Sequence, residues 1–169
     1  MRALLLSITI FLGACSVLPA SPPAPVVYDL GPPGSQLKAG VSLQSVDAPE
    51  WLDSTAMLYR IGDPNRLQGY RDSRWAAAPS ALLSARLQQR ISSQGPTRAL
   101  SVSLEVFEQR FMSAGASEVC VRARGRLADR EQTFEVKLAG GSEAASGARA
   151  LARASDALIE QVLEWTAGQ

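Results

Sequence analysis

The chain of 169 residues carries 17 basic and 16 acidic residues and contains no histidine. The absence of histidine removes the commonest general base and the commonest metal ligand of proteins. The nearly balanced charge provides no general attraction to nucleic acid, so the composition argues against a nucleic-acid partner.

The first fifteen residues have the pattern of a bacterial lipoprotein signal peptide. Arg2 supplies a positive charge, and the apolar run from Ala3 to Leu12 is ten residues long. A bilayer span needs about 20 residues, whereas this length is typical of the hydrophobic region of a signal peptide. The run ends in the lipobox Leu-Gly-Ala-Cys, which predicts cleavage after Ala14 and acylation of Cys15. The alternative is an ordinary cleavage site that leaves Cys15 as a disulfide partner.

We therefore predict a signal peptide over residues 1–14 and a lipidated, proline-rich tether over residues 15–27. Proline-rich segments favour an extended conformation of about 3.1 Å per residue. Several acyl chains on one cysteine hold a protein stably in a membrane. Ser16 stands where an aspartate typically retains lipoproteins in the inner membrane, so the outer membrane is favoured, with the domain facing the periplasm.

The next part of the chain predicts four short strands followed by a helix. The strands are expected at residues 26–30, 41–46, 56–61 and 67–71. The helix is expected to begin at Pro79, a residue that suits a first helical turn, and to end before Gly95 and Pro96. Its apolar residues recur every four positions at Leu83, Leu87 and Ile91, so we expect Arg86, Gln89 and Arg90 to point outward.

Three strands with alternating apolar and polar residues follow, and then a long alanine-rich helix. The expected inward-facing residues are Leu100, Val102, Leu104 and Val106, then Val119, Val121, Ala123 and Leu127, then Phe134, Val136 and Leu138. Strict alternation is typical of an antiparallel sheet covered on one face. The final helix is expected over residues 143–165. The pattern predicts one domain over residues 28–169 of the α+β class, a two-layer fold with a mainly antiparallel sheet and two helices packed on one face.

Three arginines, Arg122, Arg124 and Arg126, share one face of a predicted strand. They form either a docking face for an anionic ligand or partner, or a solvated surface with cross-strand ion pairs of well under 1 kcal/mol each. The second interpretation is favoured.

Cys120 shares a strand face with these arginines rather than with the valines, so we expect it to be semi-exposed. Without histidine it lacks the base that a nucleophilic cysteine needs, and a structural or interface role is favoured over a reactive thiol. Acidic residues scattered through turns lack the spacing of a calcium loop; these are Asp47, Glu50, Asp53, Asp63 and Asp72. No catalytic residue, metal site or cofactor is predicted, and we expect the chain not to be an enzyme.

Aromatic and basic residues gather in the segment from Tyr59 to Trp75. Tyrosine, tryptophan and arginine dominate the binding energy of protein interfaces. The candidate partner-binding residues are therefore Tyr59, Arg60, Arg74 and Trp75. The alternative is that Tyr59 and Trp75 pack in the core beneath the first helix.

This middle segment resembles the family of ABC-type transport auxiliary lipoproteins. The residues that carry the resemblance are Tyr28 and Leu30, Trp51-Leu52-Asp53, Met57 to Arg60, Tyr70, Arg74-Trp75, Pro79, Leu82-Leu83, and Leu100, Val102, Leu104 and Phe107. Family members often carry an acidic residue after the tryptophan, whereas Ala76, Ala77 and Ala78 stand here.

The resemblance implies a companion of transport systems with MCE (mammalian cell entry) domains, which carry phospholipid or other hydrophobic cargo across the periplasm. In that role the chain would be held in the outer membrane by its lipid and would dock an MCE-domain periplasmic protein. Whether it forms a homo-oligomer stays open. The alternative function is a lipoprotein assembly or envelope-maintenance factor that binds another outer-membrane protein or the cell wall.

Overall fold

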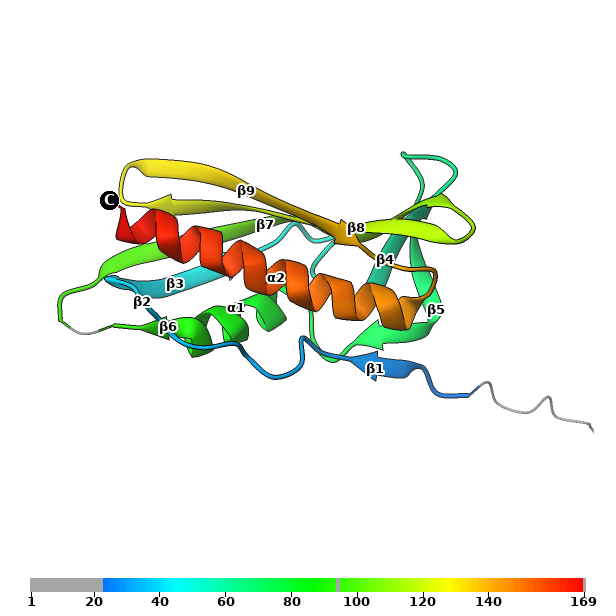
Figure 1. Cartoon of the computed structure of the whole chain (residues 1–169), viewed down its shortest axis with the longest axis horizontal. Helices are drawn as coiled ribbons and strands as arrows, with labels where there is room; N and C mark the ends of the chain where they lie inside the picture. The colour runs from blue at the N-terminus through cyan, green and yellow to red at the C-terminus, as the bar shows by residue number, and fades with distance from the viewer. Residues whose placement is uncertain (1–22, 94, 169) are drawn as a thin grey trace, which may run out of the picture.

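A computed structural model describes residues 23–93 and 95–168 of the chain, and Figure 1 shows its arrangement. The predicted signal peptide, Cys15 and most of the predicted tether lie outside the described residues. The elements are, in chain order, β1 (Val26–Tyr28), β2 (Leu37–Lys38), β3 (Val41–Asp47), β4 (Ala56–Ile61), β5 (Leu67–Trp75), α1 (Pro79–Arg90), β6 (Ile91–Ser92), β7 (Arg98–Ser113), β8 (Ala116–Leu127), β9 (Arg130–Ala139) and α2 (Ala144–Ala167).

Seven strands form one mixed sheet in the order β1-β5-β4-β7-β8-β9, and β3 also pairs with β7. Both β3 and β4 run parallel to β7, β3 beside its first half and β4 beside Gln109 to Phe111. The long ladders from β7 to β8 and from β8 to β9 are antiparallel. The predicted fold class is therefore confirmed, although several strand pairs are parallel.

The two helices cover one face of this sheet and share one hydrophobic core with it (Figure 1). α2 packs against β8 and β9, and α1 packs against β3. The core extends from Leu30 to Leu163, so the chain from Cys15 onward contains all of it. Neither helix of the described part is long and apolar enough to cross a membrane.

One predicted inward residue of β7 is wrong, because the strand contains a bulge. The pairing with β8 shifts register between Leu104 and Val106. The extra residue, Glu105, reverses the alternation after it. Phe107 is therefore buried in the core while Val106 turns toward the other face and is half-buried.

The prediction that Arg86 and Arg90 point outward is also wrong, since both side chains are buried. Arg86 donates hydrogen bonds to the carbonyl oxygens of Leu30 and Gly31. Arg90 lies 2.8 Å from a carboxylate oxygen of Glu160 and 3.4 Å from one of Asp156. The carboxylates belong to α2 and lie 66 and 70 residues further along the chain, so the periodicity of α1 could not indicate them. The two arginines tie the segment after β1 to both helices.

Candidate partner-binding site

A buried glutamate orients two arginines on the open face of the sheet, the face that the helices do not cover. Glu108 of β7 is only 2% exposed. The Nε atom of Arg60 lies 2.9 Å and 3.0 Å from its two carboxylate oxygens, and the Nε atom of Arg110 lies 2.6 Å from one of them. The parallel pairing of Arg60 with Arg110 brings the two guanidinium groups together from segments 50 residues apart. Charge-assisted hydrogen bonds of this kind are short and directional.

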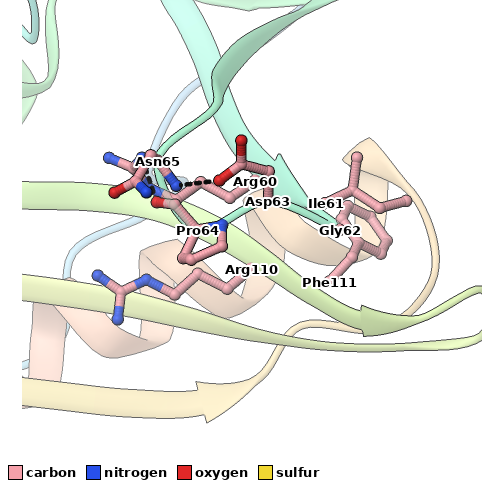
Figure 2. A pocket seen from close by; sticks show the side chains of 8 residues that line it. All are labelled: Arg60, Ile61, Gly62, Asp63, Pro64, Asn65, Arg110 and Phe111. Carbon is pink, nitrogen blue, oxygen red and sulfur yellow. Dashed lines mark hydrogen bonds between the residues drawn. The ribbon is translucent and has the colours of Figure 1, made fainter.

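The same arginines line a groove at the end of the sheet. The groove has a volume of about 590 Å³ and is closed on one side by the turn from Gly62 to Asn65 (Figure 2). Arg60 Nη1 donates a hydrogen bond of 2.8 Å to the carbonyl oxygen of Pro64, and the backbone N–H of Asn65 donates to a carboxylate oxygen of Asp63. The turn is therefore held by Arg60 and by its own aspartate.

Among the side chains that line this groove, Arg110 has the most hydrogen-bond donors without a partner in the described residues. Burial lowers the pKa of Arg110, but the hydrogen bond and the charge of Glu108 raise it on balance. Within residues 23–93 and 95–168, its hydrogen bonds involve Nε only, so both terminal nitrogens are without a partner. A guanidinium fixed through Nε can offer its terminal N–H groups to a carboxylate or phosphate in a defined orientation.

Exposed apolar side chains lie at the same end of the sheet as these arginines, and Ile61, which pairs with Phe111, points to the face opposite Arg60 (Figure 2). Ile61 is 47% exposed and Met112 is 72% exposed. Phe111, between Arg110 and Met112, is half-buried with its ring 6.0 Å from that of Tyr59. Methionine, aromatic residues and arginine are enriched at protein interfaces. The end of the sheet therefore combines oriented charge with exposed apolar surface.

The structure does not bring the four predicted partner-binding residues together. Tyr59 and Arg60 are neighbours on β4 but point to opposite faces of the sheet, as successive strand residues do. Tyr59 is half-buried against Tyr70, with ring centroids 4.6 Å apart. Burial, and secondarily the nearby Tyr59, raise the pKa of Tyr70 to about 12. Arg74 is exposed on β5, where it pairs in register with Val27 of β1.

Trp75 lies in the core, in agreement with the alternative that the sequence left open. Its ring packs at 5.3 Å against Phe107 in an edge-to-face arrangement. Its indole N–H has no hydrogen-bond partner among the described residues. Trp75 could therefore affect partner binding only indirectly, by packing beneath β5.

Two of the three arginines on β8, Arg122 and Arg124, form cross-strand ion pairs, as favoured from the sequence. Arg122 donates to Glu135 of β9, and Arg124 donates to Glu105 of β7 at 2.8 Å. The hydrogen bond with Glu135 raises the pKa of Arg122, and the same bond lowers the pKa of the Glu135 carboxyl. Exposed pairs of this kind contribute little to stability.

The expected exposure of Cys120 is wrong. The residue is completely buried, with its sulfur 3.4 Å from a carboxylate oxygen of Glu135. Burial raises the pKa of its thiol to about 11. On the central strand β8 it lies between Glu108 of β7 and Lys137 of β9, whose longer side chains flank a small one. A thiol with so high a pKa is a poor nucleophile at neutral pH.

The scattered acidic residues are used in turns and local pairs. Asp53 accepts a hydrogen bond from Ser80, and Asp72 pairs with Arg71. Nowhere in residues 23–93 and 95–168 do three cysteine, aspartate or glutamate side chains gather in a way that could hold a metal ion.

Glu108, Arg110, Phe111 and Met112 were not among the residues predicted from the sequence. They come from β7, and only the parallel pairing of β4 with β7 brings them to Arg60. Nothing local in the sequence indicates such a pairing.

Comparison with known proteins places this fold among solved structures and the sequence in a family. A crystal structure of a protein from Xanthomonas campestris is similar with a TM-score of 0.66 at 17% identity, covering 86% of this chain and 91% of that one. A crystal structure of an uncharacterized protein is similar with a TM-score of 0.65 at 15% identity, covering 85% of this chain and 99% of that one. A search of the curated proteins found no match.

The sequence matches the ABC-type transport auxiliary lipoprotein component family over residues 23–164. The chain therefore belongs to this family of lipoproteins that accompany ABC transport systems, as its resemblance predicted.

Proposed function

We propose that the protein is a non-enzymatic, outer-membrane-anchored component of an MCE-type intermembrane lipid transport system. In this role it docks the periplasmic conduit of the system at the outer membrane. The family supports an auxiliary role in transport. The observation that carries the docking role is the pair Arg60 and Arg110, oriented by the buried Glu108 at the end of the sheet where Ile61 and Met112 are also exposed.

The anchor of this proposal is an acylated Cys15. Each CH₂ group that enters the bilayer contributes about 0.8 kcal/mol, and more than one acyl chain makes attachment stable. Cells fed a labelled fatty acid should transfer the label to the wild-type protein and not to the Cys15→Ser variant. An unlabelled wild-type protein would contradict the proposed anchor.

The docking surface of the proposal is the groove at the end of the sheet. Arg60 and Arg110 would bind acidic groups of the MCE-domain protein, and Ile61 and Met112 would bury apolar surface against it. Desolvated arginines contribute strongly at interfaces because one guanidinium makes several directed hydrogen bonds. Tyr59 lies beside this groove through Phe111, while Arg74, further along β5, is a secondary candidate.

Co-purification of an MCE-domain protein from the same cells tests the docking role. Arg110→Ala and Met112→Asp should keep the melting temperature of the wild type and lose most of the bound partner. Arg126→Ala is the matched control, because Arg126 is exposed on the same open face and forms no ion pair within the described residues. Equal co-purification by all variants would place the docking surface elsewhere. Recovery of an unrelated outer-membrane protein or of cell wall would favour the envelope-maintenance function.

A further inference from the structure

A second groove lies at the opposite side of β5 from the first, between β1 and α2. It has a volume of about 550 Å³, and its apolar lining comes from Val27 and Leu30 on one side and from Ala148 and Ala152 on the other. Val26 and Val27 are both about half-exposed. The two alanines leave room because their side chains end at Cβ. The groove is therefore shallow, apolar in its floor and open to solvent.

Positive charge without a partner among the described residues lines the α2 side of this groove. Arg149 and Arg153 line it from successive turns of α2, and neither forms an ion pair or side-chain hydrogen bond with any described residue. The acidic residue of the groove, Asp29, accepts a hydrogen bond from the backbone N–H of Gly31. One turn further along α2, Asp156 is engaged by the buried Arg86 and Arg90. Neither carboxylate pairs with Arg149 or Arg153, so the α2 side of the groove is basic.

The position of the groove in the chain brings it close to the predicted anchor. β1 is the first described element, and Figure 1 shows the chain entering the domain beside it. If Cys15 is the acylated residue, only residues 15–22 precede the described part. Eight residues span at most about 27 Å when fully extended. The first groove, by contrast, lies beyond the turn after β4, separated from β1 by the length of β5.

We propose that the groove between β1 and α2 lies against the surface of the membrane that carries the anchor. Val26 and Val27 contact the headgroup layer, and Arg149 and Arg153 bind phosphate groups of its lipids. Basic side chains close to an anionic lipid surface are attracted to it, and the attraction extends over about one Debye length. The tether makes this contact effectively intramolecular, so a weak interaction is sufficient to orient the domain. The inference rests on the proposed function only for the anchor at Cys15.

Depth-dependent quenching on vesicles tests this contact. The chain from residue 15 onward, with Cys15→Ser and an N-terminal hexahistidine tag, is attached to vesicles that contain nickel-chelating lipid. The tag replaces the anchor, so the result does not depend on acylation in the cell. An environment-sensitive fluorophore is placed at Ala152→Cys, in the groove, or at Gln161→Cys, an exposed site on the same helix. Cys120 is buried and its thiol pKa is raised to about 11, so it should not take the label.

On vesicles of phosphatidylethanolamine and phosphatidylglycerol with spin-labelled lipid, the label at Ala152 should be quenched several-fold more than the label at Gln161. Arg149→Gln with Arg153→Gln should weaken this contact by roughly ten- to thirty-fold. Arg66→Gln with Arg126→Gln, an equal loss of charge from exposed sites, should leave it unchanged.

Equal quenching of the two labels, or full quenching in the Arg149 and Arg153 double variant, would overturn the proposal. A change in the fluorescence of the groove label with dispersed phospholipid, below its vesicle-forming concentration, would indicate a site for single lipid molecules. That result would also overturn the proposal. The proposal would also be overturned if vesicles did not quench the label at Ala152 and only the periplasmic partner shielded it.

Discussion

The two grooves both combine arginines with apolar side chains, but they hold their arginines in different ways. At the end of the sheet, Arg60 and Arg110 are bound through Nε to the buried Glu108. Between β1 and α2, Arg149 and Arg153 have no partner within the described residues. A guanidinium oriented by a buried carboxylate presents its remaining N–H groups in one direction, which suits a partner of defined shape. A freely moving guanidinium suits a fluid surface such as a lipid headgroup layer.

This difference indicates how one small domain could contact a membrane and a protein at once. The first groove lies at the turn before β5, and the second lies beside β1, which pairs with the last residues of β5. The buried Arg86 and Arg90 connect the segment after β1 to both helices, which makes the region nearest the tether part of the rigid domain.

The largest effect on stability should come from Trp75, the last residue of β5, which pairs with Tyr28 of β1 near the second groove. Trp75→Ala removes a core side chain and should lower the free energy of unfolding by about 3–5 kcal/mol. Trp51→Ala is the matched control, because Trp51 is exposed and its loss should change stability by less than about 0.5 kcal/mol. Urea unfolding of both variants gives the comparison. Equal stabilities would mean that Trp75 does not pack in the core.

The next largest effect should come from Glu108, which orients the arginines of the first groove. Glu108→Gln keeps the shape of the side chain and removes its charge, leaving two guanidinium groups without a counterion. We expect a loss of about 1–3 kcal/mol, since Arg60 and Arg110 are 24% and 36% exposed and regain some hydration. The melting temperature and the amount of co-purified partner should both decrease. A variant with normal docking would show that the orientation of the arginines is unimportant.

A much smaller change in stability should follow the loss of charge in the second groove. Arg149→Gln with Arg153→Gln alters exposed, unpaired side chains, so the melting temperature should stay within 1–2 °C of the wild type. Co-purification of the MCE-domain protein should persist while contact with vesicles is lost. Loss of both interactions together would contradict the separation of the two grooves.

The smallest effect at neutral pH concerns Cys120, beneath the charged face near the first groove. Its thiol pKa is raised from 9.0 to about 11, so the folded state favours the protonated thiol. The contribution to stability is complete below pH 9 and is lost as the pH rises toward 11, because the unfolded chain releases the proton first. Alkylation by iodoacetamide at pH 8 should be slow in the native protein and fast in urea. Rapid alkylation of the native protein would mean that solvent reaches the Cys120 thiol in the folded state.

The sequence predicted the long elements of the fold well because their periodicities are local, but it missed the short strands β2 and β6, and Ile91, expected on the first helix, lies on β6. The alternation of β8 and β9 and the long helix α2 appear close to their expected positions. The errors have non-local causes. A single extra residue at Glu105 reverses the face of Val106, and the carboxylates that bury Arg86 and Arg90 lie on a distant helix.

The candidate site was predicted less completely for the same reason. Arg60 was singled out from its neighbours in the chain, but its companions Glu108 and Arg110 reach it only through the parallel pairing of β4 and β7. Trp75 was a candidate because tryptophan is common in interfaces, yet the sequence could not distinguish an exposed ring from a core ring. The structure shows that the ring of Trp75 is buried in the core.

Site-specific photo-crosslinking in living cells tests the central claim most directly. A photoreactive amino acid is placed at Met112, in the first groove, or at Ala152, in the second. We expect Met112 to crosslink to the MCE-domain periplasmic protein and Ala152 to crosslink to phospholipid without a protein adduct. A protein adduct at Ala152 together with none at Met112 would contradict this claim.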